Sequence, residues 1–170
     1  MDDIERFILG ETDEEFLCIS EEDNQDIACS MMQQAELRVD ILSYDLEPDV
    51  YDNEACLEAV EDLALRSRYS KIRILIHDAQ KISRRGHSFI YLARRVGSLI
   101  QLRSMAEVHK SFRENFLIVD GIGVMHRPYA DTLAATVNFK DAPKARDLSK
   151  IFEKLWKDAE PDPNSQYLVI

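Results

Sequence analysis

The sequence predicts an α/β fold with a mixed, largely parallel sheet flanked by helices on both faces. Short segments with alternating apolar and polar residues are followed, several times, by segments with apolar residues at every third or fourth position. This β-α-β-α-β-α-β order indicates a parallel sheet covered by helices, to which the later chain adds a hairpin, a strand and a closing helix. The 170 residues suit a single domain (1–170), with residues 1–13 expected to be loosely ordered.

Strands alternate with helices in the first half of the chain. Residues 14–20 and 37–45 read as strands, and residues 71–78 form a more continuous apolar run of the kind found in central strands. Ser20 is placed to cap the helix between the first two strands, because its hydroxyl can accept from a backbone N–H of the first turn. A second helix is expected over residues 51–69.

The third helix and the hairpin follow. A helix over residues 80–96 ends at Gly97, and residues 98–103 form the next strand. Residues 114–128 then read as two strands joined at Asp120-Gly121, a favoured residue pair for a tight hairpin turn.

The end of the chain adds one strand and one helix. Residues 133–139 form the strand, and the closing helix begins near Asp141 and is stopped by Pro161. The tail over residues 165–170 is apolar, so we expect it to add an edge strand or to pack on a partner.

The chain is acidic, with 21 Lys and Arg residues against 32 Asp and Glu and a formal charge of −11. A field of that sign repels a phosphate backbone, so no nucleic acid partner is expected, although bases gather within residues 81–113. The N-terminal stretch is acidic and lacks an apolar run, and no segment has the length of a membrane span. We therefore expect a cytoplasmic protein without membrane association.

The cysteines and histidines do not suggest a metal centre. Cys18, Cys29 and Cys56 are odd in number and widely spaced, so we expect three core thiols rather than a disulfide framework or a zinc site. The four histidines lack the spacing of metal ligands. No metal and no other cofactor is predicted.

Residues 113–121 (RENFLIVDG) carry the one informative motif. Together with the order of elements from about residue 14 to 158, this stretch resembles one half of the phospholipase D-like superfamily. In that superfamily a signature HxKxxxxD lies on this hairpin. Its His is the nucleophile that takes a phosphoryl group, its Lys stabilises the phosphate charge, and its Asp orients or tunes a His.

The signature positions hold other residues in this chain. Arg113 takes the His position, Asn115 the Lys position and Asp120 the Asp position, and Arg127 falls where a GSxN segment often begins. An arginine guanidinium stays protonated and has no lone pair for attack, and asparagine has no charge to offer a phosphate. The resemblance therefore implies a degenerate, single-domain bacterial member with the family fold and without its catalysis.

The same residues leave two interpretations open. Arg113 and Arg127, on adjacent strands, would present two guanidinium groups to a carboxylate or phosphate, and Asn115 would add an amide. Alternatively, Asp120 pairs with one of the arginines and the cluster is structural. His77, at the end of a central strand, is a candidate for the pocket wall.

Three functions are compatible with these residues. The first is a non-catalytic binding or protein-interaction module, for which the resemblance implies a homodimer, because active relatives bring two signature copies together. The second is a phosphodiesterase or nuclease with a relocated nucleophile, His109 beside Lys110 or His126 on the outgoing hairpin strand. The third is a small-anion sensor that uses the arginines and His77.

Overall fold

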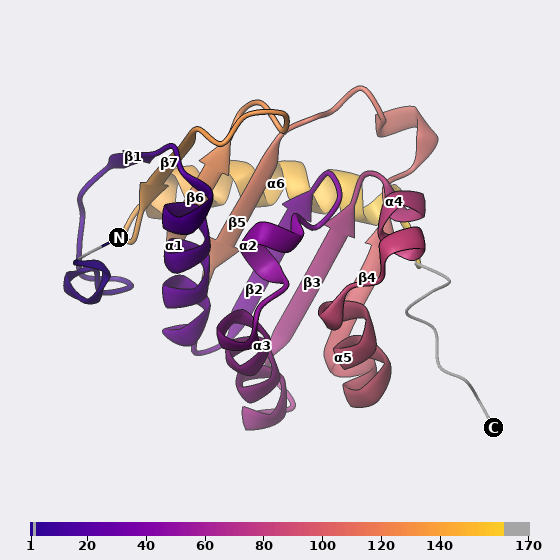
Figure 1. The fold of residues 1–170 in the computed structure, drawn as a ribbon, viewed down its shortest axis with the longest axis horizontal. Helices are drawn as coiled ribbons and strands as arrows, with labels where there is room; N and C mark the ends of the chain where they lie inside the picture. Colours follow the sequence, from indigo (N-terminus) through magenta and orange to yellow (C-terminus); the bar gives the residue numbers. More distant parts are fainter. Residues whose placement is uncertain (2, 162–170) are drawn as a thin grey trace.

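The computed structural model describes residue 1 and residues 3–161. Within these residues one sheet holds eight strands in the order β1-β7-β6-β5-β2-β3-β4-β8 (Figure 1). The strands are β1 Phe16–Cys18, β2 Arg38–Ser43, β3 Lys71–Ile76, β4 Ile100–Ser104, β5 Asn115–Val119, β6 Gly123–Arg127, β7 Ala135–Asn138 and β8 Glu160–Pro161.

The sheet is mixed, as predicted, but the expectation that it is largely parallel is wrong. Among the described strands only β2–β3 and β3–β4 pair in parallel, and every other neighbouring pair is antiparallel. The main reason is β1, which lies at the far edge of the sheet with Phe16 opposite Val137 of β7 instead of starting a β-α-β unit beside β2. An alternating pattern identifies a strand but carries no information about a distant partner.

Helices cover both faces of the sheet, as predicted. In Figure 1 the helices α1 to α5 lie in front of the sheet and α6 lies behind it. The helices are α1 Glu21–Gln33, α2 Pro48–Tyr51, α3 Glu54–Arg66, α4 Ala79–Arg85, α5 Ser88–Val96 and α6 Ala142–Asp158, with short 3-10 turns η1 Ile4–Arg6, η2 Gly97–Leu99 and η3 Glu107–His109.

A separate apolar core fills each side of the sheet. Ile41 and Leu117 belong to the core beneath α1 to α5, whereas their strand neighbours Leu42 and Phe116 belong to the core beneath α6. Successive strand residues point to opposite faces, so one strand supplies both cores. Because of the same alternation, Asn115 and Arg127 share one face of the sheet, whereas His126 lies on the other face with Phe116.

Two helices predicted as continuous are interrupted. Gly86, with a φ of 77°, ends α4, and His87 starts α5 because its Nδ1 accepts a hydrogen bond from Phe89 N at 3.1 Å. The predicted helix over residues 51–69 is α3 alone, which begins after Asn53, whose Oδ1 accepts from Cys56 N at 3.0 Å. Side-chain caps of this kind stop or start a helix where the apolar spacing would allow it to continue.

The predicted hairpin turn is present. Ile122 N donates to Val119 O at 3.0 Å, and the two residues between them, Asp120 and Gly121, have φ angles of 51° and 67°. A turn with two left-handed central residues matches the twist of the flanking strands, which explains the Asp-Gly pair. Ladder pairing of β5 with β6 starts at Val119 opposite Gly123.

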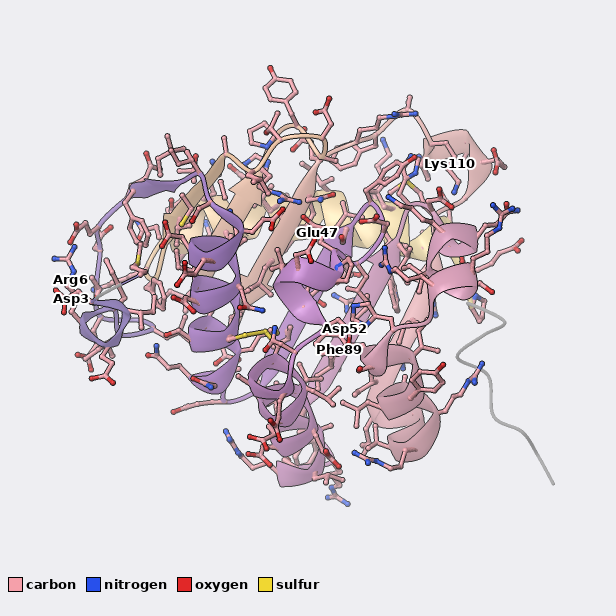
Figure 2. The ribbon with its side chains drawn as sticks, in the orientation of Figure 1. Asp3, Arg6, Glu47, Asp52, Phe89 and Lys110 are labelled. Atoms are coloured by element: carbon pink, nitrogen blue, oxygen red, sulfur yellow. A yellow bond between two sulfur atoms is a disulfide. The ribbon has the colours of Figure 1, made fainter. Side chains whose placement is uncertain are left out.

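The expectation of three free thiols is wrong for two of the cysteines. Cys29 of α1 and Cys56 of α3 form a disulfide, with their Cα atoms 4.7 Å apart (Figure 2). The wide spacing gave no sign of this pair, because the packing of α1 beside α3 brings the two residues together. Cys18 remains a buried thiol, and burial raises its pKa to about 12. The cysteine content therefore no longer favours a reducing compartment.

Two further expectations concern the membrane and the tail. None of the helices in the described residues is both long and apolar enough to cross a membrane. The edge strand or partner contact expected for residues 165–170 falls outside the part of the chain that the structure describes.

Candidate functional site

The predicted site residues gather mainly at one edge of the sheet, where the parallel strands β2 and β3 end and β5 begins. We call this the upper edge. Here Asn115, the first residue of β5, lies opposite Arg127, the last residue of β6. Residues 44–47, which follow β2, and His77, which follows β3, lie at the same edge. Open α/β sheets commonly bind ligands beyond the carboxyl ends of their parallel strands.

Asn115 is buried beneath this edge. Its side chain is 4% exposed, and its Oδ1 accepts a hydrogen bond from Tyr44 N at 2.9 Å. Its Nδ2 has no hydrogen-bond partner among the described residues. A buried amide donor without a partner is costly, so the position is either a remnant of a polar site or part of one that a ligand completes.

Arg127 is buried beside Asn115 and is already paired. It is 3% exposed and forms an ion pair with Glu47, whose Oε2 accepts from Ser43 Oγ at 2.9 Å. Burial lowers the pKa of Arg127, while the charge of Asp45 opposes that shift. Figure 2 shows Glu47 beside the start of α2, at the upper edge. Arg127 therefore holds the loop after β2 against the hairpin and has little charge to offer a ligand.

Arg113, in contrast, is exposed and has no carboxylate partner within the described chain. Its guanidinium carbon lies 5.7 Å from the ring centre of Tyr44. Lys81 lies over the same ring at 6.0 Å but pairs with Asp45 at 2.5 Å. These side chains line a cleft of about 730 Å³, here called the upper cleft, together with Tyr129 and Asp131.

Asp120 does not lie with the other predicted site residues. It follows the far end of β5, and its carboxylate accepts hydrogen bonds from the backbone N–H groups of Glu36 (2.7 Å), Leu37 (2.9 Å) and Arg38 (2.7 Å). Neither arginine of the upper edge pairs with it. Asp120 thus ties the hairpin turn to the start of β2.

His77 lies at the upper edge, next to Tyr44. The two rings stack with their centres 4.6 Å apart. His77 Nε2 lies 2.7 Å from Lys110 O, and because a carbonyl only accepts, Nε2 carries the proton. Nδ1 is buried and has no partner among the described residues. A neighbouring cleft of about 680 Å³ is lined by both His77 and Lys110.

His109 and His126 lie apart from Asn115 and Arg127. His109 Nε2 is 2.7 Å from an Asp158 carboxylate oxygen, and His126 Nε2 is 2.7 Å from Glu114 Oε2. His126 precedes Arg127 in β6 and therefore points to the opposite face of the sheet, where its ring meets Phe116. The structure does not bring either histidine to the upper cleft, which no histidine lines within the described residues.

Sequence reasoning missed the residues that shape the cleft. Tyr44 lies near the cations of both Arg113 and Lys81, and Glu47 neutralises Arg127. Their position directly after a central parallel strand was the available signal, since loops at that edge carry ligand contacts. The resulting arrangement offers one exposed guanidinium beside aromatic rings, which suits binding of an anion with a planar or apolar group attached.

Residues 20–168 match the family described as "Domain of unknown function (DUF7931)", and the chain belongs to this family. No curated protein matched the sequence.

Solved structures share the fold. TrmBL2, an archaeal chromatin protein whose structure shows a novel mode of DNA binding, aligns with a TM-score of 0.63 and 16% identity over 89% of this chain and 55% of its own. This chain thus spans about half the length of TrmBL2. Nuc from Salmonella typhimurium, a phospholipase D family member, aligns with a TM-score of 0.58 and 15% identity over 87% of this chain and 98% of Nuc. NucT from Helicobacter pylori aligns with a TM-score of 0.61 and 12% identity over 87% of this chain and 98% of NucT.

The α/β prediction is confirmed, and the fold is similar to that of phospholipase D family members. The expectation that excluded a nucleic acid partner is wrong. It is overturned by TrmBL2, a DNA-binding chromatin protein that shares the fold over 89% of this chain. The reasoning failed because net charge describes the whole chain, whereas a nucleic acid meets only a local surface.

Proposed function

We propose that this member of the DUF7931 family is a non-catalytic domain that binds the phosphodiester backbone of nucleic acid at the upper cleft. One observation carries the proposal. Where the phospholipase D signature would place its nucleophile, the chain has Arg113, an exposed cation over Tyr44 with no carboxylate partner in the described residues. A guanidinium binds a phosphate through paired N–H donors but does not attack it.

The aromatic side chains of the upper cleft support nucleic acid as the ligand class. Tyr44 forms part of the cleft wall and Tyr129, which is 69% exposed, stands at its rim. Proteins that bind single strands combine cations for the backbone with aromatic rings on which bases stack. The fold is also shared with TrmBL2, a DNA-binding protein.

The histidine geometry supports the absence of catalysis. A relocated nucleophile would need an accessible imidazole nitrogen near Arg113. Neither His109 nor His126 is among the described residues that line the upper cleft, and His77 has one nitrogen on a carbonyl and the other buried. The phosphate-stabilising Lys of the signature is replaced by Asn115, which is neutral.

Binding is tested by fluorescence anisotropy of labelled single-stranded and duplex DNA at several salt concentrations. The Arg113→Ala variant is expected to weaken binding of every sequence and to reduce the slope of log affinity against log salt by about 1, as loss of one phosphate contact does. Arg146→Ala, on the exposed side of α6, is the matched control and is expected to bind as the parent does. Unchanged binding by Arg113→Ala, or no binding at low salt, contradicts the proposal.

Catalysis is tested separately with a chromogenic phosphodiester and the pure protein. No turnover above the buffer rate is expected for the parent or for the His77→Ala, His109→Ala and His126→Ala variants. Turnover that one of these substitutions removes would show that the nucleophile has moved and that the domain is an enzyme. A thermal shift with inorganic phosphate in the absence of DNA binding would make the upper cleft a small-anion site instead.

A further inference from the structure

A second hollow, here called the lower cleft, lies at the opposite edge of the sheet. It occupies about 360 Å³ at the amino ends of β3 and β4, on the face covered by α6. Six of its lining residues carry the argument: Arg68, Ser70, Lys71, Arg73, Gln101 and Trp156. None of them lines the upper cleft.

The lower cleft is cationic, and none of the described residues that line it carries a carboxylate. Arg73 is neutralised, since its Nε donates to Asp40 at 2.7 Å and its Nη2 to Glu153 at 2.6 Å. Arg68 and Lys71 are not, because Arg68 donates only to the neutral Tyr69 hydroxyl at 2.7 Å and Lys71 forms no ion pair within the described residues. Two positive charges without an ion-pair partner among the described residues therefore flank this hollow in a chain whose net charge is −11.

Ser70 gives an independent sign of a ligand. Its side chain lines the lower cleft, it is only 7% exposed, and its Oγ has no hydrogen-bond partner among the described residues. A buried hydroxyl left without a partner is costly, so proteins rarely keep one without a reason. A ligand oxygen in the cleft would accept its proton.

We propose that the lower cleft binds the phosphate group of a small phosphorylated molecule. Lys71 and Arg68 supply the positive charge, the Ser70 hydroxyl donates to a phosphate oxygen, and the Gln101 amide offers a further donor. The volume suits a compact ligand rather than a polymer. The inference is independent of the function proposed for the upper cleft, because the two clefts share no residue.

Trp156 provides a local readout. It is the single tryptophan of the chain and lines the lower cleft, where its ring lies between the guanidinium groups of Arg103 (4.4 Å) and Arg73 (5.3 Å). An anion bound near these guanidinium groups changes the electric field at the indole ring, and with it the fluorescence of Trp156. We expect inorganic phosphate to change the Trp156 emission saturably, and sodium chloride at equal ionic strength to leave it unchanged.

Two substitutions test the assignment. Lys71→Gln is expected to raise the phosphate concentration at half-saturation about tenfold, as loss of a charged partner does, and Ser70→Ala to raise it by a smaller factor. Ser70→Ala removes only an unpartnered hydroxyl, so the variant should fold as the parent does. Arg113→Ala is the matched control, and it should weaken DNA binding while keeping the phosphate response of Trp156.

Three outcomes overturn the inference. The first is an emission change that is linear in salt and equal for phosphate and chloride. The second is a saturable response to acetate but not to phosphate, which would indicate a carboxylate site. The third is a phosphate response that Lys71→Gln and Ser70→Ala leave intact or that Arg113→Ala removes. A failure of DNA binding at the upper cleft would leave these results unaffected.

Discussion

The two ends of β5 both hold residues that the sequence comparison placed at signature positions, yet these residues are in opposite chemical states. At the upper end, the buried Asn115 amide has a donor without a partner among the described residues, and its neighbour Arg127 depends on the single carboxylate of Glu47. At the lower end, Asp120 accepts three backbone hydrogen bonds, all of 2.9 Å or less. The comparison indicates that the lower end is held by backbone hydrogen bonds, whereas the upper end depends on one side-chain ion pair.

The largest expected effect comes from removing the ion pair between Glu47 and Arg127 at the upper end of β5. Glu47→Ala leaves the guanidinium of Arg127 buried without its ion-pair partner, which should lower the free energy of unfolding by about 3–5 kcal/mol. Urea unfolding followed by circular dichroism measures this loss. Asp49→Ala, which removes an exposed carboxylate in the first turn of α2, is the control and should have little effect.

A second substitution sharpens the same test. If the loss comes from the unpaired charge, then Arg127→Met in the Glu47→Ala background should recover much of it, because no buried charge remains. A double variant as unstable as Glu47→Ala alone would mean that Glu47 acts through the loop after β2 rather than through Arg127.

The next effect concerns Asp40, a carboxylate of β2 that is 1% exposed and bound by Arg38 and Arg73. Burial raises the pKa of Asp40 to about 6, against the influence of Arg38. The folded state then holds the proton more tightly than the unfolded state, whose Asp pKa is about 3.9. The stabilisation that Asp40 contributes is therefore fully present below the unfolded-state pKa of about 3.9 and is lost as the pH rises through about 6.

Asp40→Asn, which cannot ionise, should remove this pH dependence. Between pH 4 and 7 the parent is expected to lose about 2–3 kcal/mol more than the variant, at 1.36 kcal/mol for each unit of pKa shift. Unfolding curves at each pH give the difference, with the exposed Asp147→Asn as control. Parallel pH profiles for parent and Asp40→Asn would show that the two arginines keep Asp40 ionised throughout.

The smallest expected effect comes from the lower end of β5. Asp120→Ala removes the acceptor of three N–H groups, but water reaches two of them, so the loss should be about 1–2 kcal/mol. Asp120→Asn should lose less, because Oδ1 alone accepts from Leu37 and Arg38. Differential scanning calorimetry of the parent and the two variants measures these differences in stability. A loss of diester or DNA binding in Asp120→Asn without a change in stability would give Asp120 a functional task and break the comparison.

Local features of this fold could be predicted from the sequence, and non-local ones could not. The Asp120-Gly121 turn and the Ser20 cap follow from the conformations these residues prefer, and both are present, with Ser20 Oγ accepting from Asp23 N at 3.1 Å. The neighbour of β1 and the Cys29–Cys56 disulfide depend on how distant segments meet, which no local pattern records.

The candidate site divides in the same way. Arg113, Asn115 and Arg127 could be selected because they stand at signature positions, and Asn115 and Arg127 lie opposite each other. The orientation of Arg113 onto Tyr44 and the capture of Arg127 by Glu47 depend on the loop after β2, whose conformation the sequence does not reveal. Asp120 was grouped with the others because it holds the Asp position of the signature, although a five-residue strand separates it from them in space.

The edge position of β1 has a consequence for synthesis on the ribosome. Residues 16–18 are translated early, but β7, their one neighbour among the described strands, begins at Ala135. Until that strand emerges, the nascent chain carries an unpaired strand with apolar side chains on both sides, including Leu17 and the adjacent Ile19, which stay exposed even in the finished fold. Unpaired apolar strands are the segments through which chains associate wrongly. Acidic residues flank this strand, with Glu14 and Glu15 before it and Glu21 and Glu22 after it. We expect their mutual repulsion to oppose association of nascent chains through the strand until β7 has been synthesised.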